Sequence, residues 1–86
     1  MGLSGEQLQT AGELVGAAAS VREAAASLRG RFPDLRAILV DDKDMRDETP
    51  ALCLGSRKVF LAASDGHCWR VTQEAAQASA LILTQA

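Results

Sequence analysis

The chain has 86 residues, a formal net charge of −2 and a hydrophobic fraction of 48%. This length predicts one domain, and the acidic balance argues against nucleic-acid binding, which typically uses a basic stripe. No stretch approaches the roughly 20 consecutive apolar residues of a membrane-spanning helix, and the first ten residues lack the basic start and apolar run of a secretory signal. We therefore expect a single cytoplasmic domain over residues 1–86, with neither nucleic acid nor membrane as a partner.

The N-terminal part, residues 4–30, is predicted to be helical. Ser4 with Gln7 has the spacing of a capping box, which satisfies amide groups at a helix start. Ser20 with Glu23 repeats this signal. The helical spacing of apolar residues on both sides of Ser20 could also be explained by one long helix. The favoured interpretation is two helices rather than one, at about residues 5–18 and 21–30.

Gly12 and Gly16 lie four residues apart in the first helix, among alanines. Each glycine weakens a helix interior by roughly 1 kcal/mol relative to alanine. Small residues at this spacing let another backbone approach closely. We expect the pair to seat the helix tightly on the sheet; the alternative is a seam between two molecules.

The remainder, residues 35–84, is predicted to form a mainly antiparallel sheet of four to five strands. Asp65-Gly66 separates two runs rich in β-branched and aromatic residues, which is typical of a type I′ hairpin. A two-residue turn places Ala62 opposite Trp69, and this small partner predicts that Trp69 is a core anchor. Helices followed by a sheet indicate an α+β fold. The expected strands are Leu35–Val40, Ala51–Leu54, Lys58–Ser64, His67–Thr72 and Ala80–Thr84, with a short helical turn at 73–77.

Leu35–Val40 is expected to be a buried strand, whereas Ala51–Leu54 and Ala80–Thr84 are candidates for sheet edges. Neither candidate carries the lysines, inward charges or internal prolines that normally block edge pairing. An unguarded edge on a small, alanine-rich core is most simply stabilised by a second copy or a partner strand. We therefore expect a homodimer, with a strand edge or the helical layer at its centre.

Cys53, His67 and Cys68 suggest a zinc or redox site, but the expected register separates them. Adjacent strand residues point to opposite faces of a sheet, so His67 and Cys68 cannot readily bind one metal. A two-residue turn at Gly55-Ser56 puts Cys53 opposite Lys58, too far from His67 to cooperate. We expect no metal site, no cofactor, and two reduced cysteines on opposite faces.

An enzyme is not expected, and no catalytic residue is assigned. The chain has no nucleophile elbow, phosphate-binding loop or dinucleotide-binding glycine motif. His67 could act as a general base or a pH switch. The favoured interpretation is a polar residue at the end of the hairpin.

Residues 41–50, DDKDMRDETP, form a charged loop. A calcium loop needs a glycine at its sixth position, where this one, counted from Asp42, has Asp47. The loop is either a solvated surface or a docking surface for a larger protein, since long loops on small scaffolds often carry binding. The docking candidates are Asp41, Asp42, Asp44, Arg46, Asp47 and Glu48, and a second candidate surface is the sheet face around His67 and Trp69.

Four segments follow an order that resembles small uncharacterised proteobacterial α+β proteins: Arg31-Phe32-Pro33, Asp41–Asp44, Gly66–Thr72 and Ala80–Leu83. The similarity covers residues 30–84 and includes no catalytic motif. Some of those proteins are encoded near nitrogen-fixation or other metalloenzyme maturation genes, so the resemblance implies an accessory role in such a system. We expect a non-enzymatic accessory or protein-interaction module. The alternative is a small-molecule or metal-cofactor binding protein that uses the Trp69/His67 face.

Overall fold

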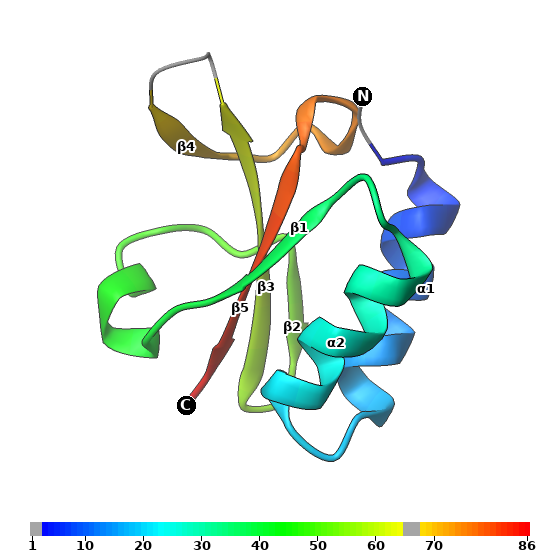
Figure 1. The fold of residues 1–86 in the computed structure, drawn as a ribbon. Helices are drawn as coiled ribbons and strands as arrows, with labels where there is room; N and C mark the ends of the chain where they lie inside the picture. The colour runs from blue at the N-terminus through cyan, green and yellow to red at the C-terminus, as the bar shows by residue number, and fades with distance from the viewer. Residues whose placement is uncertain (1–2, 65–67) are drawn as a thin grey trace.

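The computed structural model describes residues 3–64 and 68–86, which form an α+β fold (Figure 1). Two helices pack on one face of a five-stranded sheet, and the charged loop lies on the other side. The helices are α1 (Gly5–Ala17) and α2 (Val21–Arg31), with short 3-10 turns η1 (Asp42–Met45) and η2 (Ala75–Gln77). The strands are β1 (Arg36–Leu39), β2 (Leu52–Leu54), β3 (Arg57–Ser64), β4 (Trp69–Thr72) and β5 (Ala80–Gln85).

The predicted break between two helices is confirmed, and both predicted caps form. Ser4 Oγ accepts from the Gln7 amide, while the Gln7 side chain accepts from the Ser4 amide to complete the capping box. Ser20 Oγ accepts from the amide of Glu23 at 3.1 Å. Because Ala18 has extended backbone angles, α1 cannot continue into α2.

The strand order is β1-β5-β3-β2, and β4 also pairs with β3. One edge of β3 pairs with β5, and its other edge pairs with β2 and then β4. The pairing is antiparallel except between β1 and β5, which are parallel. The predicted mainly antiparallel sheet is therefore confirmed.

Two predicted strand positions are wrong, and both errors concern β1 and β5. The terminal strand β5, expected at an edge, lies between β1 and β3. The strand expected to be buried, β1, is instead at the edge, where only Ala37 is buried and Leu39 is exposed. The apolar run 35–40 could not distinguish a central strand from an edge strand, because an edge strand that packs under a helix is as apolar as a central one. The short strand β2 is at an edge, as predicted.

The predicted register of the second hairpin is also wrong. Ser64 pairs with Trp69 and Ala62 with Val71, so Trp69 is two positions from its expected place opposite Ala62. The predicted type I′ turn at Asp65-Gly66 lies outside the described residues, as does His67. Because a shift of two preserves the alternation of side chains, Trp69 keeps the face that the sequence predicted.

The first hairpin has the predicted two-residue turn. Leu54 pairs with Arg57 and Cys53 with Lys58, so Gly55 and Ser56 form the connection. Gly55 has a φ of +66°, the left-handed region required at the first position of a type II′ turn.

Alternating residues of the strands fill two apolar layers. The layer between the helices and the sheet contains the larger buried cluster, with Val15 and Leu28 from the helices and Val59, Leu81 and Leu83 from the strands. The face opposite the helices, which we call the back face, buries Phe60, Ala62, Ala80 and Thr84. The sheet is thus buried on both faces, but the back face is covered only in part.

Arg57, at the start of β3, joins the helical layer to the sheet. Its guanidinium donates to the carbonyls of Val15 at 2.8 Å, Ala18 at 2.6 Å and Ala19 at 3.1 Å. The last carbonyls of a helix lack partners within it, and α1 has no basic residue in its last turn. Arg57 therefore supplies from the sheet the cation that a helix C-terminus favours.

Gly12 and Gly16 have different surroundings. The predicted close approach between α1 and the sheet occurs at Gly12 and not at Gly16. Gly12 is buried, and a Cβ added there would lie 3.0 Å from Leu52 Cδ1 on β2. A Cβ at Gly16 would meet nothing within 4 Å. Gly12 therefore seats α1 on the sheet, whereas Gly16 faces solvent.

The two glycines generate a paired prediction. We expect Gly16→Ala to raise the free energy of unfolding by about 0.5–1 kcal/mol, because it gains helix propensity in open space. Gly12→Ala gains the same propensity but must displace Leu52, so its net effect is expected to be zero or destabilising. Urea unfolding followed by circular dichroism measures both variants. Equal stabilisation by both would contradict the tight contact at Gly12.

A second prediction concerns the guanidinium of Arg57. Arg57→Ala is expected to lower the free energy of unfolding by about 2–3 kcal/mol, because three carbonyls lose a charged donor. Arg57→Lys should recover only part of this loss, since an ammonium cannot reproduce the planar fork. Exposed Arg22 provides the control, and Arg22→Ala should stay within about 0.5 kcal/mol of the wild type.

Candidate functional site: a groove on the back face

The back face has a row of small side chains at its centre. The register aligns Arg36 of β1, Ala80 of β5, Ala62 of β3 and Val71 of β4 across the sheet. Side chains in one cross-strand row share a face, so two alanines lie between larger neighbours. The result is a depression in the sheet surface.

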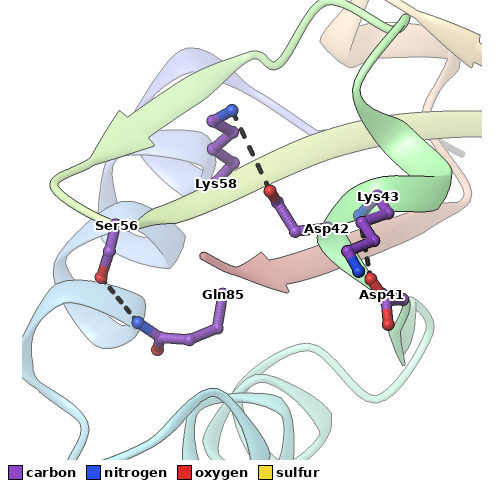
Figure 2. Close-up of polar contacts among 6 residues, drawn as sticks. All are labelled: Asp41, Asp42, Lys43, Ser56, Lys58 and Gln85. Atoms are coloured by element: carbon purple, nitrogen blue, oxygen red, sulfur yellow. Dashed lines mark hydrogen bonds and ion pairs between the residues drawn. The ribbon is translucent and has the colours of Figure 1, made fainter.

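The charged loop is fixed against this face rather than extended into solvent. Met45 of η1 is buried, and the Lys58 ammonium lies 4.0 Å from an Asp42 carboxylate oxygen (Figure 2). The Gln73 side chain donates to the carbonyl of Thr49 at 2.9 Å, which ties the far end of the loop to the segment after β4. The ion pair is exposed and weak, so the burial of Met45 contributes most to this docking.

A groove of about 210 Å³ lies where the loop meets the sheet. We call it the back-face groove. Its floor is formed by Ala62 and Ile82, and its lining residues are Met45, Glu48, Ala62, Trp69, Arg70, Val71 and Ile82. The groove brings together Glu48, predicted for partner docking, and Trp69, predicted for ligand binding. The two candidate surfaces of the sequence analysis meet here.

Trp69 is not the predicted core anchor. The indole is 47% exposed and stands at the rim of the groove, with the Arg36 guanidinium carbon 5.9 Å from the ring centroid. Its cross-strand partner is Ser64 at the end of β3, which lies beyond the region covered by the loop. The buried aromatic of this face is Phe60, which is 1% exposed.

The other predicted docking residues do not line the groove. Asp42 lies near Lys58, and Asp41 accepts from the amide of Lys43 to start η1 (Figure 2). Asp44, Arg46 and Asp47 are exposed on the loop. His67, predicted with Trp69, lies outside the described residues.

Sequence reasoning missed Arg36, Met45, Arg70 and Val71. Arg36 and Trp69 come from β1 and β4, which the strand order places on either side of β5 and β3. Nothing in the sequence specified that order. The one signal for Met45 was its place as the sole apolar residue within the run 41–48. An apolar residue in a charged loop often marks the point where the loop touches the protein.

Within residues 3–64 and 68–86, no group of three or more His, Cys, Asp or Glu side chains could hold a metal ion. Cys53 and Cys68 are exposed thiols, and Cys53 lies opposite Lys58 as predicted. Cys68 precedes β4, so the predicted placement on the opposite strand face does not apply to it.

No helix among the described residues is long and apolar enough to cross a membrane. A family model described as a family of unknown function, DUF6129, matches residues 10–86, and the chain therefore belongs to that family. No curated protein and no solved structure matches the chain. The family match includes the second half of α1, all strands and the back-face groove.

Because Trp69 is exposed and Phe60 is buried, the loss of stability on substitution should be larger for Phe60 than for Trp69. We expect Phe60→Ala to cost about 3–5 kcal/mol, since it empties a fully buried site. Trp69→Ala should cost less than half as much and leave the protein folded. Thermal unfolding followed by circular dichroism measures both. A larger loss for Trp69→Ala would mean that the indole is part of the core.

Proposed function

We propose that this member of the DUF6129 family is a non-enzymatic protein-interaction module that docks a partner protein in the back-face groove. The observation that carries the proposal is the half-exposed indole of Trp69 beside an apolar floor. Tryptophan and arginine are enriched among the residues that dominate binding energy at protein interfaces. Here Trp69 and Arg36 are neighbours at the groove rim.

The size of the groove favours a protein partner over a free small molecule. Small-molecule sites usually enclose about 300–1,000 Å³ and surround most of the ligand. The back-face groove has about 210 Å³ and is bounded by a sheet on one side and a loop on the other. That space fits one or two apolar side chains presented by a larger surface.

The charges around the groove define the chemistry of the partner. The loop over residues 41–48 carries five acidic and two basic side chains, and Glu48 reaches the groove itself. A partner segment with an apolar residue flanked by lysine or arginine would complement this surface. Arg36 and Arg70 at the opposite rim favour an acidic residue further along the same segment.

An accessory role in a metalloenzyme system, a cytoplasmic location and the absence of catalysis remain predictions. They rest on the resemblance and on the residue inventory. The docking proposal does not depend on them, because it concerns only the chemistry of the groove.

Affinity capture from cells that express the protein tests the proposal. We expect one partner to be retained by the wild type and by Arg22→Ala, an exposed change on the helical side. Trp69→Ala and Glu48→Lys should lower its retention at least tenfold while the circular dichroism spectrum stays unchanged. Equal retention by all four proteins would show that the groove is not the docking site.

The small-molecule alternative has its own measurement, because Trp69 is the only tryptophan of the chain. Its fluorescence reports binding in the groove without a label. A saturable change on adding a low-molecular-weight fraction of the same cells, absent for the protein fraction, would favour a small ligand instead.

A further inference from the structure

The outer edge of β1 is a second exposed surface, and Arg36 is the residue that it shares with the rim of the back-face groove. In the parallel pairing with β5, the Arg36 amide donates to the Ser79 carbonyl and the Val40 amide to the Leu83 carbonyl. Successive residues of a strand direct their backbone groups to opposite edges. The backbone groups of Ala37 and Leu39 therefore point outward, away from β5.

This edge is only partly closed. The Arg29 guanidinium donates to the Ala37 carbonyl at 2.7 Å, which leaves that oxygen a second lone pair. Within residues 3–64 and 68–86, no group accepts from the amides of Ala37 and Leu39 or donates to the Leu39 carbonyl on this side, and Leu39 is 39% exposed. An open hollow of about 450 Å³ follows the edge, lined by Arg29, Leu35, Arg36, Ala37, Ile38 and Leu39.

Charge is distributed unevenly along the edge. Arg29 and Arg31, at the end of α2, together with Arg36 outnumber Asp34 and make the end where β1 begins net basic. Asp41, Asp42 and Asp44 outnumber Lys43 and make the end where β1 leads into η1 net acidic. Two antiparallel copies of this edge bring each basic end to an acidic end, whereas two parallel copies bring like charges together.

We propose that the β1 edge binds the β1 edge of a second copy of this chain, in antiparallel orientation about a twofold axis near Leu39. Reciprocal bonds between the Leu39 amide of one copy and the Leu39 carbonyl of the other form the centre. Each Arg36 then lies toward the acidic end of the other copy, and the two sheets become continuous. The edge of β2 is a weaker candidate, because that strand has three residues.

The two surfaces share Arg36, which lies beside Trp69 at the groove rim and also at the basic end of the β1 edge. The groove is tested by Trp69 and Glu48 variants through capture of a partner, and the edge is tested through the mass of the protein alone, so either proposal can fail without the other. A twofold axis perpendicular to the sheet reverses the strand direction but does not turn the sheet over. The back faces of both copies therefore lie on the same side of the joined sheet. Both back-face grooves would therefore open in the same direction.

Complementary charge reversal tests the arrangement. One variant reverses the acidic end with Asp41→Lys and Asp44→Lys, and the other reverses the basic end with Arg31→Glu and Arg36→Glu. All four side chains are exposed; Asp41 also accepts from the Lys43 amide and Arg36 lies over Trp69. Asp42 and Arg29 are kept for their contacts with Lys58 and Ala37. The matched control is Glu6→Lys with Glu13→Lys, both exposed on α1.

Light scattering coupled to size exclusion gives the mass of each species at up to about 1 mM, where weak interfaces also assemble. We expect the wild type and the control to have twice the chain mass of 9.1 kDa, and each reversed variant to be monomeric by itself. An equimolar mixture of the two reversed variants should restore the doubled mass, because both ends are again complementary. Circular dichroism identifies a variant that fails to fold.

Leu39→Pro provides an independent variant, since it removes the outward amide without touching the bonds to β5. It should be folded and monomeric, whereas Leu39→Ala, which keeps the amide, should retain association. A wild type that stays monomeric at the highest concentration would overturn the proposal. So would reversed variants that dimerise by themselves, or a mixture that does not.

Discussion

The hydrogen bonds of Arg57 hold the two layers of the molecule in one arrangement. The side chain starts on β3, reaches the C-terminal turn of α1 and continues to the carbonyls that lead into α2. Its Nε also donates to Gln85 Oε1, and the Gln85 amide donates to Ser56 Oγ at 2.6 Å (Figure 2). One guanidinium thus fixes the end of a helix, the turn between β2 and β3, and the end of β5. The sheet and the helical layer cannot slide past each other without breaking this set.

With the layers fixed, the two faces of the sheet acquire different roles. The helix-facing side has large aliphatic side chains and is sealed by α1 and α2. The back face has alanine at two central positions, and the cover that η1 provides reaches only part of it. Small residues on an incompletely covered face leave a depression, and the exposed indole stands beside it. The alternation of side chains along the strands, which places the large aliphatic residues under the helices, thus also places the small residues that form the groove on the back face.

Local signals in the sequence predicted the local structure well. The two serine caps predicted where the helices begin, and Gly55-Ser56 predicted a two-residue turn with its register. The register inferred from Asp65-Gly66 was wrong by two positions, because Ser64 rather than Ala62 pairs with Trp69. Trp69 kept its predicted face but lost its predicted burial, since burial depends on what covers that face.

The candidate site was predictable only in part, because it depends on strand order. Glu48 and Trp69 were each selected from the sequence as separate candidates. Their meeting requires the loop to cross the back face, and the contact between Arg36 and Trp69 requires β5 and β3 between them. Periodicity describes one element at a time and carries no information on which strands are neighbours.

The position of β5 has a consequence for how the chain folds during its synthesis. Domains often begin to fold before translation is complete. Here β1 is joined to the rest of the sheet only through β5, which follows the other four strands of the sheet in the chain. Until residues 80–85 leave the ribosome, β1 has no strand to pair with, α2 lacks its contacts with β5, and the edge of β3 that pairs with β5 remains open. The fold therefore closes late, and a nascent chain stalled before Ala80 exposes the surfaces that a chaperone binds.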